Sequence, residues 1–292
     1  MSDKIRLFLN GLLCPSAPIQ VVHRQAPALM KLPPLTRKIA SRIVRSIPLL
    51  RRQILVSTDY RVLGGADEAH RLAAAGSGWL SGRTARRQDR AYRSLIAGMK
   101  SGEPRLDLEI AAEAVAATGI DRPRLIEIGC GSGYYSEVFA QLAPSGVQYT
   151  GIDYSPPMIA RARERYPAAE FAVGDATALQ YPDNSFDIAF NGVSLMHIID
   201  YEKAIREAAR VAARHCIFHS VPVFDEHHRT IFLQKYAYGA PVVEIVFDRR
   251  EFLAISEKAG LRLVRSWKSI PYDVAAITGH PSRSETFLFS VA

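Results

Sequence analysis

Residues 125–135 read LIEIGCGSGYY, and this stretch decides the fold. An apolar strand runs into an acidic residue and then into a loop with glycine at every second position. When a helix follows such a loop at once, backbone N–H groups and a helix N-terminus approach a ligand with no Cβ in the way. Tyr134 stands where the dinucleotide-binding fingerprint requires a further glycine. The stretch therefore predicts a cofactor cradle of another kind, formed by Gly129, Gly131 and Gly133.

Two carboxylates follow the next predicted strands. Residues 148–153 (QYTGID) end in Asp153, at roughly the distance along the chain from the first glycine that places a carboxylate beside a ribose. Asp153 is expected to accept hydrogen bonds from the two ribose hydroxyls. Asp175 follows a third strand at residues 171–173, where it is placed to accept a hydrogen bond from an exocyclic amine. A cofactor that contains adenosine is implied.

The runs EIGCGSG, GIDYSPPMIARAR and GDATALQYPDNSFDIAFN follow one another between residues 127 and 191. In order and spacing they resemble the linked strand motifs of class I S-adenosylmethionine-dependent methyltransferases. The resemblance implies S-adenosylmethionine as the cofactor. It also implies an α/β fold with a doubly wound Rossmann-like sheet, mostly parallel with an antiparallel last strand, plus an N-terminal helical extension. By the resemblance, the cofactor-binding residues are Glu127, Gly129, Gly131 and Gly133 at the methionine end, Asp153 and Tyr154 at the ribose, Asp175 and Ala176 at the adenine, and Asn191 beneath the sulfonium.

Methyl transfer from a sulfonium mainly requires positioning and desolvation of the two reactants, so a base is needed only if the acceptor must lose a proton. His197, in SLMHIID after the fourth strand, is the best candidate for that base, although a packed side chain is the more frequent role for any single histidine. Weaker candidates are His219, Tyr134, Tyr135, His227 and His228. The adjacent pair of histidines at 227 and 228 lacks the spacing of metal ligands, so no metal site is expected.

The net charge of +8 is concentrated at the N-terminus. Residues 4–58 contain ten basic and no acidic residues, and the stretch 35–50 has the pattern of a basic amphipathic helix. Such a segment suits peripheral contact with the anionic inner face of a membrane, but an apolar stripe packed on the core with a solvated basic face is the favoured alternative. Three widely spaced cysteines and the need for the cofactor point to the cytoplasm.

We divide the chain into a basic arm (1–58), a helical lid region (59–122) and a cofactor-binding methyltransferase domain (123–292). Helices are expected at residues 87–99 and 106–118, with Trp79 and Tyr92 as candidates for the inner face of the lid. Strands at 261–267 and 285–291 are expected to close the sheet. An insertion at 222–248, at the carboxyl edge of the sheet, is expected to cover the acceptor site.

The sequence around the end of the fourth strand limits the classes of molecule that could accept the methyl group. Residues 191–194 read NGVS, which lacks the proline-aromatic motif of enzymes that methylate nucleic-acid bases, and residues 190–199 lack the carboxylates of protein arginine methylation. A small-molecule, sugar or lipid-linked acceptor, methylated at oxygen, is expected, and residues 238–252 weakly resemble bacterial methyltransferases of surface-polysaccharide type. An NAD(P)-dependent oxidoreductase and a non-catalytic cofactor-binding interaction protein are the two alternatives.

Overall fold

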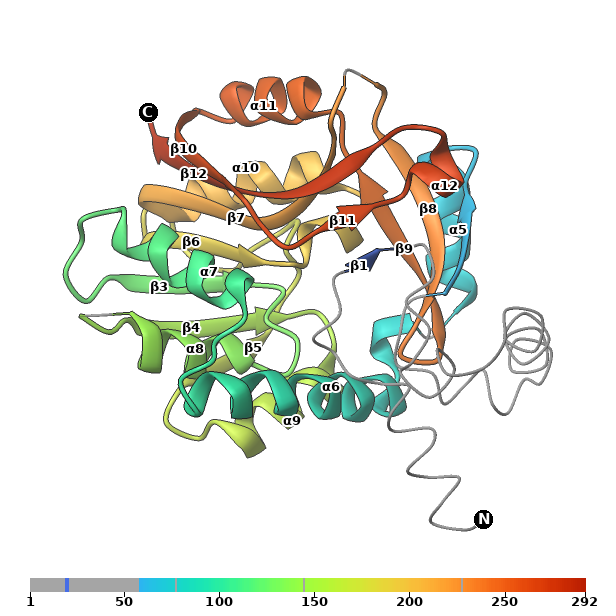
Figure 1. Ribbon diagram of the computed structural model, residues 1–292. Helices are drawn as coiled ribbons and strands as arrows, with labels where there is room; N and C mark the ends of the chain where they lie inside the picture. Colours follow the sequence, from blue (N-terminus) through green and yellow to red (C-terminus); the bar gives the residue numbers. More distant parts are fainter. Residues whose placement is uncertain (1–18, 21–57, 77, 144, 227) are drawn as a thin grey trace, which may run out of the picture.

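The computed structural model describes residues 19–20, 58–76, 78–143, 145–226 and 228–292 (Figure 1). The helices are α5 (Ala66–Ala75), η1 (Gly78–Leu80), α6 (Gly82–Lys100), α7 (Leu106–Ala116), α8 (Tyr134–Leu142), α9 (Pro156–Arg165), η2 (Leu195–His197), α10 (Tyr201–Val211), α11 (Arg249–Lys258) and α12 (Ala275–Thr278). The strands are β1 (Ile19–Gln20), β2 (Thr58–Val62), β3 (Arg124–Ile128), β4 (Gln148–Asp153), β5 (Glu170–Val173), β6 (Phe186–Gly192), β7 (Ala212–Phe224), β8 (Ile231–Ala237), β9 (Ala240–Val246), β10 (Leu261–Lys268), β11 (Tyr272–Asp273) and β12 (Ser282–Val291).

The central sheet has seven strands in the order β10-β12-β7-β6-β3-β4-β5. Neighbouring strands from β7 to β5 run parallel, whereas β12 is antiparallel to both β7 and β10. The expected doubly wound, mostly parallel sheet with an antiparallel last strand is confirmed. The order reverses between β3 and β6, and a ligand site is expected at that reversal, outside the carboxyl ends of the strands.

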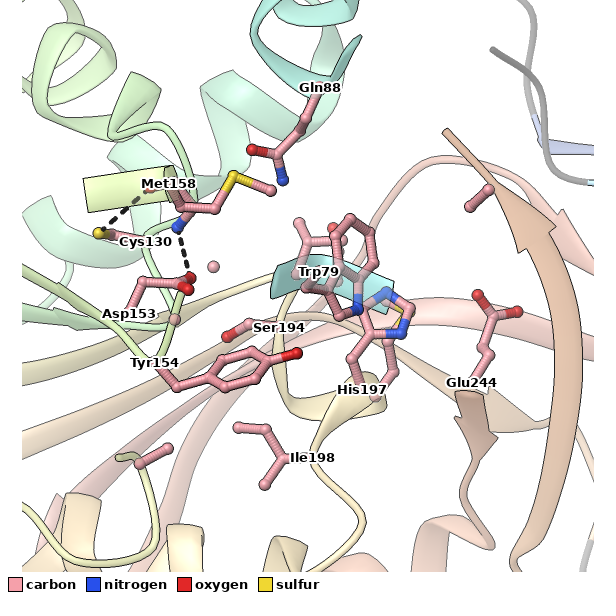
Figure 2. Close-up of a pocket in the computed structure, with 18 of the residues that line it drawn as sticks. Trp79, Gln88, Cys130, Asp153, Tyr154, Met158, Ser194, His197, Ile198 and Glu244 are labelled. Carbon is pink, nitrogen blue, oxygen red and sulfur yellow. Dashed lines mark hydrogen bonds between the residues drawn. The ribbon is translucent and has the colours of Figure 1, made fainter. Parts of the chain in front are cut away.

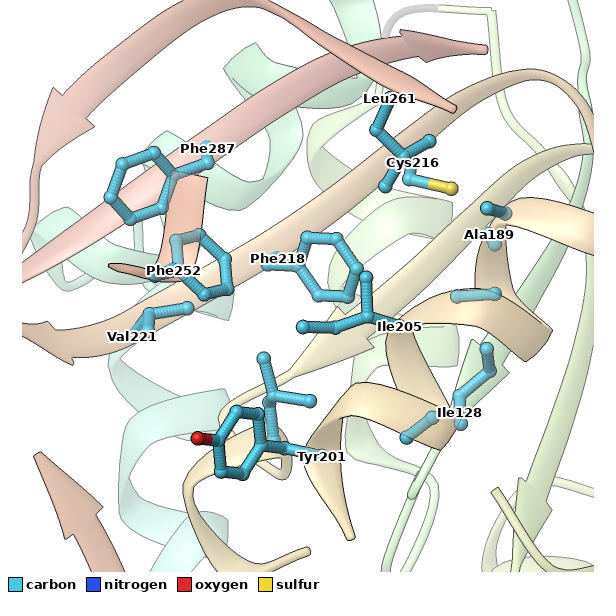
Figure 3. Close-up of a cluster of buried hydrophobic side chains, with 14 of the residues drawn as sticks. Ile128, Ala189, Tyr201, Ile205, Cys216, Phe218, Val221, Phe252, Leu261 and Phe287 are labelled. Carbon is cyan, nitrogen blue, oxygen red and sulfur yellow. The ribbon is translucent and has the colours of Figure 1, made fainter. Parts of the chain in front are cut away.

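Helices cover both faces of this sheet. On one face, apolar side chains of α10 and α11 pack against β7 and β12, and Figure 3 shows Phe218, Phe252 and Phe287 meeting there. The rings of Phe252 and Phe287 lie 4.9 Å apart, centroid to centroid. On the opposite face, α6, α7 and α8 pack around Leu125 and Phe190. Because both faces are buried, the inner strands are almost continuously apolar, as the sequence of residues 125–128 is.

A second, three-stranded sheet of order β2-β8-β9 stands beside the first, on the right in Figure 1. Two expectations change here. The region 59–122 is not helical throughout, because its first residues belong to β2, which pairs antiparallel with β8. The insertion at 222–248, for which no secondary structure was predicted, contains the β-hairpin of β8 and β9, with Tyr238 and Gly239 at its turn, both at positive φ.

Most of the basic arm lies outside the described residues, so its proposed amphipathic helix and its contact with a membrane stay predictions. The described exception is β1, whose residues pair in parallel with β11. In the described part of the chain, no helix combines the length and apolar composition needed to cross a membrane.

Candidate functional site

A cavity of about 450 Å³ opens where the strand order reverses. Its lining includes the loops after β3, β4 and β5 on one side and the β8–β9 hairpin with β11 on the other. Figure 2 shows Asp153 and Tyr154 on one side, Glu244 on the other, and Trp79 and His197 between them. We call the first side the cofactor half and the second side the inner half.

The glycine loop brings bare backbone to the cofactor half. Gly129 and Gly131 line the cavity at φ +78° and +55°, conformations that favour glycine. A Cβ on Gly129 would lie 2.4 Å from Oγ of Ser194, and one on Gly131 would lie 2.8 Å from Oε1 of Gln88. No larger residue fits this loop without displacing its neighbours, which agrees with a cradle that a ligand approaches closely.

Asp153 is fixed by the loop that it faces. Its Oδ2 accepts a hydrogen bond from the amide of Gly131 and its Oδ1 accepts one from the amide of Ser155, each at 2.9 Å. Burial raises the pKa of this carboxyl to about 6, although both amide hydrogen bonds oppose the shift. Asp153 therefore holds a negative charge at neutral pH at the rim of the cofactor half.

Ser155 connects Asp153 to a distant turn. It occupies the N-cap position of α9, but its side chain makes no capping bond. Its Oγ instead donates to the carbonyl oxygen of Trp79 at 2.8 Å. A hydrogen-bonded chain thus runs from the Asp153 carboxylate through Ser155 to the turn that carries Trp79.

Seven of the ten predicted site residues line the cavity: Gly129, Gly131, Asp153, Tyr154, Asp175, Ala176 and His197. At the adenine end, Oδ1 of Asp175 accepts from the amide and the hydroxyl of Thr177, both at 2.8 Å. This leaves the other oxygen of Asp175 available to a ligand. Cofactor contacts by these residues stay predictions.

The other three, Glu127, Gly133 and Asn191, are not among the residues that line the cavity, and their contact with a cofactor stays a prediction. Gly133 faces β5 instead, and a Cβ there would lie 2.7 Å from the Phe171 ring. Both polar ends of the Asn191 side chain bond to backbone, Nδ2 donating to Ile128 O at 3.2 Å and Oδ1 accepting from Leu195 N at 2.7 Å. Asn191 thereby ties η2 to the end of β3.

Glu127 lies beneath Gly192, where a Cβ would come within 2.6 Å of its Oε1. The Tyr149 hydroxyl donates to this carboxyl group. Burial raises the pKa of Glu127 to about 8, and the charge of Asp153 adds to the shift. Glu127 is therefore protonated at neutral pH and supports the floor of the site from below.

His197 stands at the boundary between the two halves. Its Nδ1 lies 2.6 Å from the carbonyl oxygen of Val243, which can only accept, so Nδ1 carries the proton and Nε2 is the basic nitrogen. The imidazole lies 5.1 Å from the indole of Trp79, between ring centroids. Burial, with the nearby charge of Lys235, lowers the pKa of His197 to about 3. The tautomer suits a base, but the basicity is weak.

The inner half contains residues that the sequence did not single out. Lys235 of β8 forms an ion pair with Oε2 of Glu244 on β9, and the Tyr272 hydroxyl donates to Oε1 of Glu244 at 2.7 Å. All three line the cavity and are buried. A signal was present in residues 231–237, where alternate positions face the core and Lys235 occupies one of them.

The helices of the predicted lid region contribute unequally to the cavity, and α5 adds His70 and Ala73 to its lining. Trp79 of η1 and Tyr92 of α6 line the cavity as expected, together with Gln88 of α6, whereas no residue of α7 does. Of the weaker base candidates, Tyr134 lines the cavity, whereas His219, Tyr135 and His228 do not, and His227 lies outside the described residues. His219 is buried against Thr286, with 2.9 Å between Nδ1 and Oγ1. No three His, Cys, Asp or Glu side chains of the described residues are grouped as metal ligands would be.

Comparison with known proteins gives one family. Residues 126–219 match a family described as "Methyltransferase domain". This segment runs from β3 to β7 and contains the glycine loop, Asp153 and His197.

Three curated relatives illustrate the similarity. The demethylmenaquinone methyltransferase of Renibacterium salmoninarum is 31% identical over 113 residues, 39% of this chain and 46% of that protein. The 2-methyl-6-phytyl-1,4-hydroquinone methyltransferase of Synechocystis is 38% identical over 30% of this chain and 28% of its own length. The 27-O-demethylrifamycin SV methyltransferase of Amycolatopsis mediterranei is 38% identical over 30% of this chain and 34% of its own length. The chain thus spans less than half the length of each of these relatives.

Among solved structures, a TehB-like SAM-dependent methyltransferase from Corynebacterium glutamicum superposes with a TM-score of 0.49 at 18% identity, over 71% of this chain and 98% of that chain.

Proposed function

Because residues 126–219 form a class I S-adenosylmethionine-dependent methyltransferase domain, we propose that the whole protein transfers a methyl group from S-adenosylmethionine to a small-molecule acceptor, at oxygen. The observation that carries the proposal is a single cavity that joins the predicted cofactor residues to a second, polar group of side chains. The relatives' names support a small molecule, since they specify a demethylmenaquinone, a phytyl hydroquinone and a demethylrifamycin. Sugars and lipid-linked molecules stay within the proposed acceptor range.

The residues of the cofactor half fit S-adenosylmethionine. The Gly129–Gly131 backbone offers close approach, Asp153 offers a buried carboxylate to the ribose, and Asp175 offers a free oxygen to the adenine. When bound there, S-adenosylmethionine supplies a methyl group on an activated carbon. The boundary residues Trp79 and His197 then hold the acceptor against that carbon and exclude water from it.

A proton must leave a neutral hydroxyl acceptor when its oxygen takes the methyl group. Nε2 of His197 is the unprotonated nitrogen at the boundary and is the proposed receiver of this proton. Its low pKa makes it inefficient with an alcohol and adequate only where the acceptor is itself acidic. The weak basicity of His197 therefore favours an acceptor with an acidic hydroxyl group over one with an ordinary alcohol.

Isotope-labelled methyl transfer from S-adenosylmethionine into extracted host metabolites and lipids tests the proposal. We expect label in a low-molecular-mass product with the wild-type protein and none with Gly131→Val, in which the side chain blocks the cradle. Absence of label from every fraction, with S-adenosylmethionine bound normally, would instead support the non-catalytic cofactor-binding protein. Calorimetry with S-adenosylmethionine, its demethylated product and NADH tests the oxidoreductase alternative. That alternative requires NADH to bind most tightly of the three.

A further inference from the structure

The inner half of the cavity has charges where the fold calls for apolar side chains. Along β8, the inward positions are Ile231, Leu233, Lys235 and Ala237. Lys235 pairs in register with Val242, and Glu244 lies two residues further on the same face of β9. A buried ion pair adds little stability compared with an apolar pair of the same size. The burial of the Lys235–Glu244 ion pair is therefore better explained by a role in binding a ligand.

Among the described residues, the hydrogen bonds of this cluster give the Lys235 ammonium one partner, so N–H donors of Lys235 remain for a ligand. Glu244 uses both oxygens, one for Lys235 and one for the Tyr272 hydroxyl. An ammonium group has three N–H donors, and Glu244 is the partner of Lys235 among the described residues. Ser284 also contributes to the cavity lining, and its hydroxyl oxygen is buried and has no hydrogen-bond partner among the described residues.

Aromatic rings separate these donors from the cofactor half. Trp79 lies 5.1 Å from His197 and 5.6 Å from Tyr238, measured between ring centroids. In Figure 2 the Trp79 and His197 rings stand between the Asp153 side and Glu244. The His197 and Tyr238 rings are tilted by 53° and 57° from the indole, so a flat molecule that packs on one of these rings would extend from the cofactor half to the Lys235 side.

We propose that Lys235, held in place by Glu244 and Tyr272, binds an oxyanion of a flat acceptor, so that the acceptor is an aromatic carboxylate or an ionised phenol or enol. This inference rests on the proposed function and specifies its substrate class. Lys235 supplies charge-assisted hydrogen bonds to the oxyanion.

The charges in the site agree with an anionic acceptor. If the ionised oxygen is itself the one that takes the methyl group, no proton has to leave it, and the weak basicity of His197 is then no obstacle to the reaction. Burial lowers the pKa of Lys235 to about 7, so the charged and neutral forms coexist at neutral pH, and a bound anion would favour the charged form. An anion between Lys235 and the cationic sulfonium would be attracted from both sides in a poorly solvated space.

The experiment uses small probes in place of the unknown acceptor. Benzoate and 4-nitrophenolate carry the two kinds of oxyanion, and benzamide is the neutral match to benzoate. Each is titrated into the full-length protein saturated with S-adenosylhomocysteine, so that the cofactor half is filled, and binding is followed by ligand-detected NMR. The chain has two tryptophans, so a Trp267→Phe background leaves Trp79 as the fluorescent reporter of benzoate at this site.

Two variants should change benzoate affinity in opposite directions. Lys235→Met keeps the length of the side chain and removes its charge, so benzoate should bind at least about tenfold more weakly with benzamide unchanged. Glu244→Gln leaves Lys235 without its anionic partner, so benzoate should bind several-fold more tightly. Lys258→Met, on the exposed end of α11, is the matched control and should change neither the affinity for benzoate nor that for benzamide. If Lys235→Met fails to fold, Lys235→Met/Glu244→Gln removes both charges and should show the same loss.

The proposal is overturned if wild-type protein binds neither anion better than benzamide, or if Glu244→Gln weakens benzoate while Lys235→Met does not. The second result would assign Glu244 to a cationic or polyhydroxyl acceptor. Preference for 4-nitrophenolate over benzoate would identify the ionised hydroxyl as the source of the oxyanion, and the reverse would identify the carboxylate. S-adenosylhomocysteine binding is measured for every variant. If neither the wild-type protein nor any variant binds it, the result contradicts the proposed function rather than this subsite.

Discussion

Nδ1 of His197 donates a hydrogen bond to the carbonyl oxygen of Val243 over 2.6 Å, which fixes both the tautomer and the direction of the ring. Because burial lowers the pKa of this histidine to about 3, the ring should stay neutral from pH 5 to 8. NMR titration of the His197 ring signals should show no change over this range, with Nδ1 protonated. A midpoint near 6.5 would mean that the ring is solvated and that Val243 does not hold it.

His197→Ala tests whether the ring takes a proton. If it does, kcat should fall roughly 100-fold with cofactor affinity nearly unchanged. The acid limb that His197 imposes on the rate should lie near pH 3, since the pKa of His197 is lowered to about 3, rather than near 6.5. His280→Ala, a histidine stacked on His228 outside the cavity lining, serves as the control. A loss of less than about threefold for His197→Ala would leave it a packing residue.

Asp153→Ala should weaken S-adenosylmethionine binding by roughly 30- to 150-fold, because about 2–3 kcal/mol of charge-assisted hydrogen bonding to the ribose is lost. Calorimetry measures the change. The variant also frees the amides of Gly131 and Ser155, so Asp153→Asn, which can still accept one of these bonds, should fold better and still lose affinity. Asp187→Ala, whose carboxylate pairs with Arg124 away from the cavity, is the control. Affinity within about threefold of wild type would remove Asp153 from the ribose site.

Gly129→Ala should lower stability by more than backbone strain alone, since its Cβ would lie 2.4 Å from Oγ of Ser194. Gly279→Ala is a matched control, because Gly279 has a similar φ of +80° and nothing within 4 Å of the added atom. Strain alone should cost about 1–3 kcal/mol. Thermal unfolding should rank Gly129→Ala below Gly279→Ala, and Ser194→Gly should restore part of the difference. Equal losses would show that the loop can shift away from Ser194.

Glu127→Gln should change how stability depends on pH. The pKa of Glu127 is raised to about 8 in the folded protein, so between about pH 4.5 and 8 the folded state holds a proton that the unfolded state lacks. The free energy of unfolding then falls as pH rises through this window, by up to about 1.4 kcal/mol per pH unit from this group. The difference between wild type and variant in denaturant unfolding isolates the contribution. A pH-independent difference would mean that Glu127 is ionised when buried.

The sequence predicted the part of the fold that is built from local patterns. The stretch 125–135 combines a buried strand, a glycine loop and a helix start within eleven residues, and each is specified by its own neighbours. The same holds for Asp153 and Asp175, which follow short apolar strands. Where these strands end therefore followed from the sequence, and so did the cavity at their ends.

The inner half could not be predicted in this way, because it depends on contacts between distant segments. β2 pairs with β8 across more than half of the chain, and a five-residue strand carries too weak a pattern to reveal that pairing. Lys235 and Glu244 meet only once the hairpin register is known. Glu127 and Asn191 show the converse, since their motif positions were clear but their hydrogen bonds, to the Tyr149 hydroxyl and to the Ile128 carbonyl oxygen, depend on the folded structure.

The hydrogen bond from Ser155 to the Trp79 carbonyl bears on the order in which two ligands would enter. Ser155 is tied to Asp153, so a nucleoside that engages this carboxylate also steadies the turn bearing the indole. The wall against which an acceptor would rest is then complete only after the first ligand has arrived. Steady-state kinetics should accordingly follow a compulsory sequence, cofactor first, and Ser155→Ala should relax it toward random addition.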